Sequence, residues 1–309
     1  MPKFSIVIPV YNREREIARA LSSCLAQDGA DFEVVVVDDG STDSTVAAIE
    51  AFSDPRVKLV RQAVNRGHAP ARNLGVRSAA EEWVIILDSD DELLPGALGF
   101  IDRTIREAAD PAERFGFMYR LDDGRLSPLP PLRNESVDYA GYLAWLERRR
   151  LYDFLACTRR ATFDSVRWPD SRWTDHSLYQ LDFAKQFRTR FCAETVAMVH
   201  TAATNRTSFA RREARNAIDS ALELGAERDL ILRRHGDALC AFAPLTFQMY
   251  HRMRAADHLL AGHRAAGLKQ SLQCLRATPL LPEAWFLLLS FLATRNAFAS
   301  IRSWRAPAT

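Results

Sequence analysis

The segment FEVVVVDDGSTD, residues 32–43, decides the fold class of this chain. Its first half is a short Val-rich run, typical of a strand that is buried on both faces of a parallel sheet. Its second half consists of carboxylates, glycine and hydroxyl side chains, which suit the loop that follows such a strand. In open α/β sheets ligands bind beyond the carboxyl ends of the strands, so the segment predicts a ligand-binding edge as well as a strand.

The rest of the first 110 residues repeats this alternation of strand and helix. Further strands are predicted at residues 4–9, 57–61 and 83–87, and helices at residues 16–27, 45–52, 71–80 and 98–108. Strands that alternate with short helices indicate right-handed βαβ crossovers and an open α/β sheet.

After residue 110 the alternation becomes irregular and then gives way to helices. Strands are predicted at residues 115–121, 154–158 and 195–199, and helices at residues 139–149, 178–187, 212–234, 241–260, 268–277 and 282–294. We therefore expect three regions. Residues 1–110 and 111–205 form two halves of one α/β domain with a mixed, mostly parallel sheet, and residues 206–309 form a helical C-terminal region.

Composition limits the class of protein. The chain has 309 residues, of which 48% are hydrophobic and 26% charged, as in an ordinary soluble globular enzyme. The net charge of +2 gives no bulk excess of positive charge for binding nucleic acid. Five scattered cysteines suit a reduced compartment, and the N-terminus carries no signal peptide pattern. A cytoplasmic location is expected.

The C-terminal region differs from the rest in charge. Residues 206–309 hold 15 Lys and Arg against 8 Asp and Glu, and residues 284–293, AWFLLLSFLA, are apolar almost throughout. This run has about half of the roughly 20 residues that a membrane-spanning helix needs. One interpretation is peripheral contact with the inner face of a membrane. A helix packed into the core or into a dimer seam is the alternative.

Clustered carboxylates follow two of the predicted strands. Asp38 and Asp39 come directly after one strand, and Asp88 and Asp90 come directly after another. Alternate residues of an extended segment point to the same side, so Asp88 and Asp90 are placed to serve one ligand. Hard oxygen ligands favour Mg²⁺ or Mn²⁺, which take substrate phosphates as further ligands. The alternative is that these residues only form loops and cap helices.

The clusters belong to a longer series of motifs with a fixed order. The series reads Ile8-Pro9-Val10-Tyr11-Asn12, Val37-Asp38-Asp39-Gly40-Ser41-Thr42-Asp43, Asn65-Arg66-Gly67-His68-Ala69-Pro70-Ala71-Arg72-Asn73-Leu74-Gly75 and Leu87-Asp88-Ser89-Asp90-Asp91. It resembles glycosyltransferase family 2, strongly over residues 4–110 and more weakly to about residue 205. The resemblance implies a GT-A (Rossmann-like) fold, a nucleotide-diphospho-sugar donor, Mn²⁺ or Mg²⁺, and transfer with inversion at the anomeric carbon.

The resemblance and the positions of the residues together assign roles on the donor side. The aspartate that matches Asp39 accepts a hydrogen bond from the nucleobase, usually uracil, and Tyr11 offers a flat face for stacking. Arg72 is expected to reach the diphosphate or the carboxylates with its guanidinium fork. Asp88 is expected to contact ribose and Asp90 to bind the metal. The donor-binding set is Pro9, Tyr11, Asp39, Arg72, Asp88 and Ser89, and the metal-binding set is Asp90 and His200.

The catalytic base is expected in the second half of the α/β domain. The segment Trp173-Thr174-Asp175-His176 is similar to the family segment in which a Glu-Asp pair opens a helix and carries the base. Thr174 replaces the usual Glu, which leaves Asp175 as the candidate. A helix N-cap is the alternative role for Asp175, and Asp170 and Asp182 are the next candidates for the base.

The expected function is an inverting glycosyltransferase that moves a sugar from a nucleotide sugar to a hydroxyl acceptor in polysaccharide or glycoconjugate assembly. A UDP-sugar is the first choice of donor, and the acceptor is a glycan or a lipid-linked molecule. A non-catalytic nucleotide-sugar-binding protein and a sugar nucleotidyltransferase are the alternatives. The second of these needs a Gly-rich basic motif after the first strand, which residues 9–12 lack.

Overall fold

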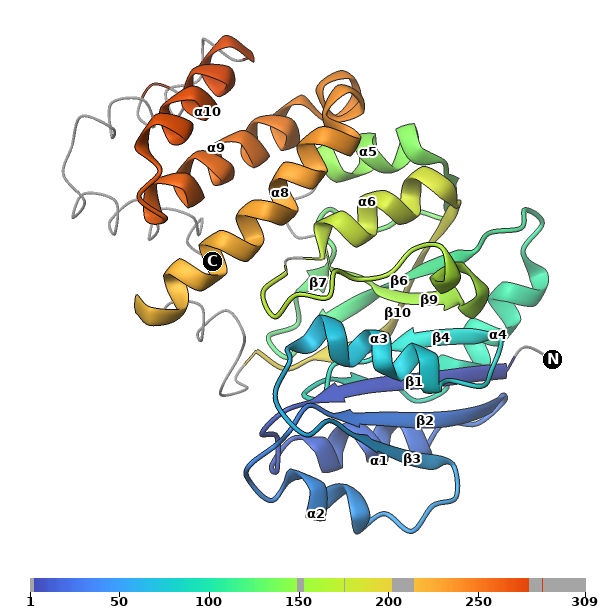
Figure 1. The fold of residues 1–309 in the computed structure, drawn as a ribbon. Coiled ribbons are helices and arrows are strands. Elements are labelled where there is room, and N and C mark those ends of the chain that lie inside the picture. The colour runs from blue at the N-terminus through green and yellow to red at the C-terminus, as the bar shows by residue number, and fades with distance from the viewer. Residues whose placement is uncertain (1–2, 149–152, 175, 202–213, 278–284, 286–309) are drawn as a thin grey trace. The chain divides into compact units, whose positions relative to one another are not determined.

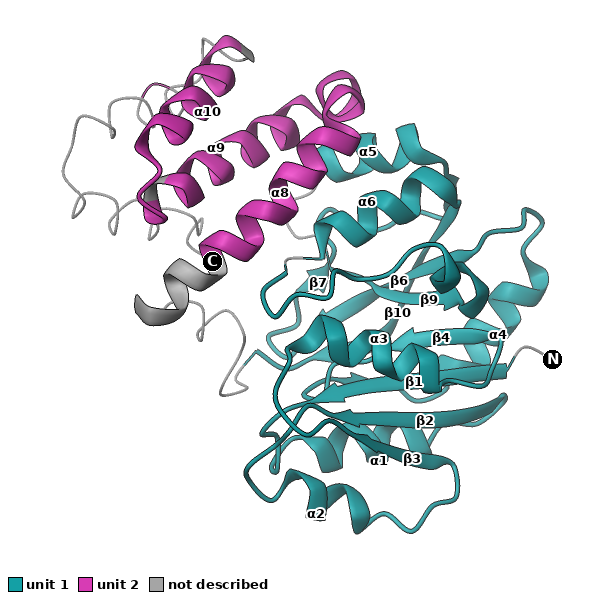
Figure 2. Ribbon diagram, in the orientation of Figure 1, with its two compact units in different colours: residues 1–209 teal, residues 210–309 magenta. Residues whose placement is uncertain are grey.

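The structure, a computed structural model, describes residues 3–148, 153–174, 176–201, 214–277 and 285. The chain divides into two compact units, residues 1–209 and residues 210–309 (Figure 2). Unit 1 contains every motif singled out above.

The described residues of unit 1 form a 10-stranded mixed sheet. Its order is β3-β2-β1-β4-β9-β6-β10-β5, with β7 paired to β6 and β8 paired to β10. Figure 1 shows β3, β2, β1 and β4 side by side. The strands are β1 (Lys3–Val10), β2 (Asp31–Asp38), β3 (Val57–Arg61), β4 (Trp83–Ile86), β5 (Glu92–Leu93), β6 (Arg114–Leu121), β7 (Leu126–Ser127), β8 (Glu135–Val137), β9 (Leu155–Arg159) and β10 (Thr189–Val199). Strands β3, β2, β1 and β4 are parallel, and β9 runs against both of its neighbours, β4 and β6.

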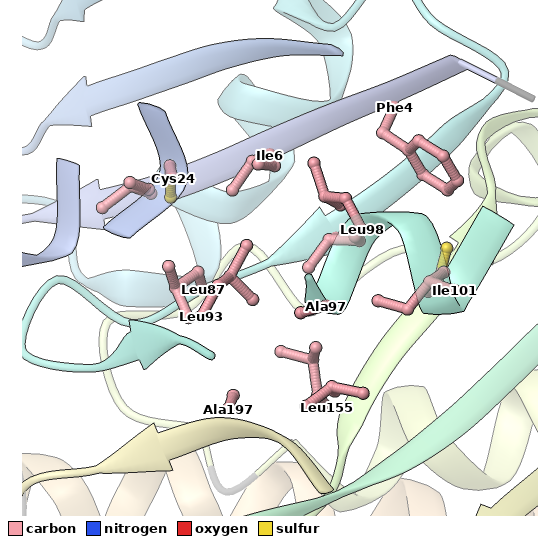
Figure 3. Packing of buried hydrophobic residues seen from close by; sticks show 14 of the residues in the cluster. Phe4, Ile6, Cys24, Leu87, Leu93, Ala97, Leu98, Ile101, Leu155 and Ala197 are labelled. Carbon is pink, nitrogen blue, oxygen red and sulfur yellow. The ribbon is translucent and has the colours of Figure 1, made fainter. Parts of the chain in front are cut away.

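Helices supply side chains to both faces of this sheet. Unit 1 contains α1 (Ile17–Leu25), α2 (Thr45–Glu50), α3 (His68–Ser78), α4 (Ala97–Glu107), α5 (Tyr139–Glu147), the 3₁₀ helix η1 (Arg160–Asp164) and α6 (Ser177–Gln186). Successive side chains of β1 point to opposite faces, so Phe4 and Ile6 join a core with α1 and α4. Val7, on the other face, packs in a second core with side chains from α3 and α6. Figure 3 shows Phe4 and Ile6 near Leu98 of α4 in the first core.

Unit 2 is helical over its described residues. It contains α8 (Ala214–Phe242), α9 (Pro244–Leu260) and α10 (Arg264–Ala277). Pro244 opens α9, where its missing N–H costs nothing. A buried ion pair joins Arg228 of α8 to Asp257 of α9, and Arg254 bridges to Asp229 at 2.7 Å. Within the described ranges, no helix is both long and apolar enough to cross a membrane.

The predicted fold class is confirmed, with differences in detail. Strand β3 has the predicted bounds, whereas α8 continues eight residues beyond the predicted end at 234 and stops only before Pro244. Strands β5, β7 and β8 were not predicted. The predicted helix at 282–294 and the apolar run 284–293 lie outside the described residues, apart from Trp285, which is 49% exposed.

Candidate functional site

The topology brings the acidic motifs to one edge of the sheet. Strand β4 is parallel to β1, and β9 reverses the direction between β4 and β6. Because β10 is parallel to β6, the carboxyl ends of β1, β2, β4, β6 and β10 all point the same way. Asp39, Asp88 and His200 therefore follow strands that end at a common edge.

Asp39 lies one residue beyond β2 and is only 3% exposed. Its Oδ1 accepts hydrogen bonds from the backbone N–H of Arg66 and the side-chain amide of Gln62, both at 2.8 Å, and its Oδ2 accepts one from the N–H of Gly67 at 2.8 Å. Burial raises the pKa of the Asp39 carboxyl, against the opposing effect of the bonds from Arg66 and Gly67. A carboxylate offers about four lone-pair positions, so the described residues leave one for a ligand.

The loop after β1 is tied to the loop after β2. Asn12 adopts a left-handed backbone with φ 51°, and its Oδ1 accepts a hydrogen bond from the N–H of Thr42 at 2.9 Å. The N–H of Arg13 donates to Thr45 Oγ1 at 2.7 Å. The N–H of Asn12 also donates to Ser41 Oγ at 2.9 Å, which gives this hydroxyl of residues 40–43 a structural role. Of the predicted donor residues here, Tyr11 is 39% exposed at the edge and Pro9 is buried within β1.

Arg72 links the loop after β4 to the start of α6. One of its terminal nitrogens donates to Asp88 Oδ1 at 2.7 Å, and the other lies 2.8 Å from His176 Nε2. The ring of His176 also packs edge-on against that of His68, with centroids 4.6 Å apart. The Asp88 side chain is 52% exposed, so it remains open to a ligand. Arg72 meets a carboxylate, which is one of the two contacts predicted for it.

The segment after Asp88 meets the end of β10. His200 lies with its Nε2 2.5 Å from Glu92 Oε1, and Arg19 Nε lies 3.1 Å from the same oxygen. Arg19 also donates to the backbone carbonyl of Asp90 at 2.7 Å, and the Asp90 carboxylate lies 3.9 Å from Arg13 Nη2. Asp90 and His200 thus lie in one charged cluster. Ser89, between the two aspartates, is buried at 7% exposure.

The carboxylates at this edge suit a divalent cation that takes its remaining ligands from substrate oxygens. Over the ranges that the structure describes, no three His, Cys, Asp or Glu side chains are grouped to hold a metal by themselves. Mg²⁺ in phosphate-transfer sites is held by one or two carboxylates, with phosphates and waters as the other ligands. Asp88 and Asp90 are of this kind, whereas the His200 ring is already in contact with Glu92.

The segment before α6 lies against the loop before α3. Arg66 bridges to Asp170 at 3.1 Å, and Gly67, at φ 99°, lies so close to Arg172 that a Cβ would be 2.8 Å from its Cα. Thr174 is fully buried, and its Oγ1 accepts a hydrogen bond from the N–H of His176 at 3.1 Å. The predicted base, Asp175, lies outside the described residues.

Four polar residues at this edge were not predicted as site residues. Arg13, Arg19 and Glu92 contact predicted site residues but stand in none of the quoted motifs. His176 stands in the quoted segment 173–176, but no role was predicted for it. Their partners are distant in sequence: Arg72 and His176 are 104 positions apart. The left-handed backbone of His176, with φ 65°, has no local signal such as glycine.

Comparison with known proteins agrees with the GT-A fold and the motif series. Residues 5–109 match the family model described as glycosyl transferase family 2, so this part of the chain is a domain of that family. The succinoglycan biosynthesis protein ExoO of Rhizobium meliloti is 45% identical over 112 residues, which cover 36% of this chain and 31% of that protein. The GalNAc(5)-diNAcBac-PP-undecaprenol beta-1,3-glucosyltransferase of Campylobacter jejuni is 35% identical over 130 residues, 41% of each protein. The matched part spans about a third to two fifths of these relatives.

A crystal structure of Staphylococcus aureus TarS, residues 1–349, in complex with UDP-GlcNAc shares the fold with a TM-score of 0.61. The alignment covers 89% of this chain and 91% of that one, at 19% identity. The predicted family is confirmed for residues 5–109, and the predicted GT-A fold is confirmed.

Proposed function

We propose that this protein is a glycosyltransferase that moves a sugar from a nucleoside-diphosphate sugar, with UDP as the preferred nucleotide, to a hydroxyl acceptor in polysaccharide or glycoconjugate assembly. The observation that carries the proposal is the convergence of Asp39, Asp88 and Arg72 on one sheet edge, within a family 2 domain. The relatives named above, one in succinoglycan biosynthesis and one a glucosyltransferase, support this class of reaction.

The donor is proposed to bind along the edge from β2 to β4. The nucleobase N–H donates to the remaining acceptor position of Asp39, and Tyr11 covers the base. The half-exposed carboxylate of Asp88 accepts from the ribose hydroxyls. Ser89 and Pro9 shape the strand ends beneath, and Arg72 holds Asp88 in place and adds positive charge beside the diphosphate.

Asp90 would hold Mn²⁺ or Mg²⁺. His200 is the second residue proposed for the cation, and its ring would have to give up the contact with Glu92 to bind through Nε2. When bound, the cation supplies Lewis acidity that stabilises the departing nucleoside diphosphate. Arg13 and Arg19, both close to Asp90, add fixed positive charge to this end of the site.

Inversion by a single displacement needs a carboxylate that takes the proton of the acceptor hydroxyl as the bond to the sugar forms. We assign this role to Asp175. Its neighbours in the sequence support the assignment, because Thr174 is buried and His176 contacts Arg72 at the start of α6.

Residues 111–205 are proposed to form the acceptor side. The Campylobacter relative is named for an undecaprenol-diphosphate acceptor, and so is the UDP-Glc:alpha-D-GlcNAc-diphosphoundecaprenol beta-1,3-glucosyltransferase WfgD of Escherichia coli, which is 41% identical over 87 residues. A lipid-linked acceptor is therefore the first to test. The basic C-terminal region, residues 206–309, is proposed to favour peripheral contact with the anionic membrane that carries it.

The test is release of free nucleoside diphosphate from UDP-, GDP- and dTDP-sugars in the presence of Mn²⁺, with and without a lipid-diphosphate acceptor. We expect acceptor-dependent release from a UDP-sugar, and a loss of roughly 10²–10⁴-fold in rate for Asp175→Asn at unchanged donor affinity. Asn caps a helix as well as Asp does, so a merely structural Asp175 gives near-normal turnover. Full activity of Asp175→Asn would remove it from the mechanism and direct attention to Asp182.

A further inference from the structure

An open cavity of about 320 Å³ lies away from the acidic edge, between the later turns of α3 and the segment around η1. Three arginines line it: Arg77 from α3, and Arg160 and Arg167 from the other wall. The single carboxylate in the lining belongs to Asp164. The three guanidinium groups and one carboxylate leave a net charge of +2 around the cavity.

Two of these guanidinium groups are held in place by the backbone. Arg160 Nε donates to the carbonyl of Glu81 at 2.9 Å, and Arg167 Nε donates to the carbonyl of Phe163 at 3.0 Å. In both cases the bond engages Nε and leaves the two terminal nitrogens available. Guanidinium groups held in this way can donate two hydrogen bonds to the oxygens of a phosphate while losing little further conformational freedom.

None of the three arginines forms an ion pair with any residue that the structure describes. The adjacent Arg159 differs in this respect, because it forms an ion pair with Glu82 at 2.7 Å. Among the described residues, no carboxylate forms an ion pair with Arg160. Exposed arginines that lie beside carboxylates elsewhere in unit 1 form close pairs, such as Arg125 with Asp123 at 2.6 Å. The positive charge around the cavity is therefore concentrated, and within the lining only the Asp164 carboxylate offsets it.

The cavity is separate from the donor edge. The N–H of Arg160 donates to the carbonyl of Glu82, just before β4 begins, whereas Asp88 follows the end of that strand. Asp88 is five positions beyond Trp83 along the extended chain, which corresponds to roughly 16 Å. A group bound at Arg160 therefore does not share its contacts with a diphosphate at Asp88.

We propose that the cavity lined by Arg77, Arg160 and Arg167 is a second anion site that binds the phosphate group of a ligand other than the nucleotide. The net charge of +2 matches a phosphate dianion, and a volume at the small end of the range of ligand pockets suits a phosphate with a short polar substituent. Two sources supply this chemistry, the headgroup of a membrane phospholipid and a soluble phosphate ester. The inference does not depend on the proposed transferase activity.

The test compares the full-length chain with the variant Arg77→Gln/Arg160→Gln/Arg167→Gln, using calorimetric titration with inorganic phosphate at low salt. A matched control, Arg103→Gln/Arg133→Gln/Arg188→Gln, removes the same charge from exposed arginines that do not line the cavity. We expect phosphate affinity to fall at least tenfold in the cavity variant and to change less than twofold in the control. Equal affinity in both variants, or no phosphate binding by the unmodified protein, would overturn the proposal.

A second arm distinguishes the source of the phosphate. Sedimentation with vesicles of phosphatidylcholine containing phosphatidic acid, whose headgroup is a phosphate monoester, should be lost in the cavity variant alone if the ligand is a headgroup. Phosphate binding that depends on the arginines, without vesicle binding, assigns the site to a soluble phosphate ester. The single variant Arg77→Gln serves as a further test in case the triple variant does not fold. Among the described residues the Arg77 side chain forms no hydrogen bond, so its replacement should leave the fold intact. It should weaken phosphate binding by itself.

Discussion

Replacing Asp39 by Asn tests whether its carboxylate is the receptor of the nucleobase. The carboxylate accepts three hydrogen bonds at 2.8 Å in a buried position. An Asn side chain has only one oxygen, so in either orientation its NH₂ group faces at least one buried N–H donor. A buried donor that loses its acceptor costs about 1–3 kcal/mol, and this is the expected loss in the free energy of unfolding.

The same substitution removes the charge from the acceptor position left for the nucleobase. A hydrogen bond to a charged group contributes about 1.5–3 kcal/mol, so we expect UDP affinity to fall by roughly 10- to 150-fold. Isothermal titration with UDP and Mn²⁺ measures the affinity, and denaturant unfolding measures the stability.

Asp38→Asn is the matched control. Asp38 is also buried, but its Oδ1 accepts a single backbone bond, from Ser41, which an Asn oxygen preserves. We expect unchanged UDP affinity in this variant. A folded Asp39→Asn protein that binds UDP as well as the unmodified protein would refute the nucleobase role. Unchanged stability would show that the three hydrogen bonds to the Asp39 carboxylate do not stabilise the fold as expected.

Three further variants test the loops around the site and the sheet beneath it. His176→Ala should lower kcat about tenfold with donor affinity unchanged, while His176→Asn, which tolerates a left-handed backbone and can still accept from Arg72, should retain more activity. Gly67→Ala should lower the free energy of unfolding by about 1–3 kcal/mol because of the backbone conformation alone, and by more because of the contact with Arg172. The control is Gly124→Ala, since Gly124 also has a positive φ but open surroundings. Urea unfolding should therefore show a larger loss of stability for Gly67→Ala than for Gly124→Ala. Burial opposes ionisation of Glu33, but the hydrogen bonds from Lys58, Ser5 and Ala80 prevail and lower the pKa of its carboxyl. The ionised Glu33 therefore stabilises the fold at pH values above the ordinary glutamate pKa of 4.5, and this stabilisation is lost as the pH falls below that value. Glu33→Gln should flatten that fall in stability, and an unchanged acid-unfolding curve would show that Glu33 has no part in it.

The sequence specified β1, β2 and β4 well because each is a largely apolar run whose residues are mostly buried. The end of β2 was predicted to within a residue, since burial on both faces leaves a signal that needs no knowledge of partners. Strand β3 was predicted from its Val and Leu residues, although none of its five residues is buried. The two- and three-residue strands β5, β7 and β8 carry too few residues for a period to be detected. The antiparallel position of β9 between β4 and β6 depends on long-range pairing, which no local pattern records.

The candidate site could likewise be predicted only in part from the sequence. Asp39, Asp88 and Asp90 could be placed at the ligand edge because they directly follow strands. The link from Arg72 to His176 and the contact of His200 with Glu92 join segments more than 100 positions apart, so only the folded chain reveals them. His200 illustrates the difference, because its position near the acidic edge was predicted whereas its carboxylate partner was not.

The central claim is that a nucleoside diphosphate binds along the edge formed by the ends of β2 and β4. A crystal structure of the protein soaked with UDP and Mn²⁺ tests it most directly. The account predicts the uracil N–H within hydrogen-bond distance of an Asp39 oxygen, the ribose hydroxyls at Asp88 and the diphosphate beside Asp90. Density for UDP elsewhere on the protein, or a uracil without contact to Asp39 in an otherwise intact site, would contradict it.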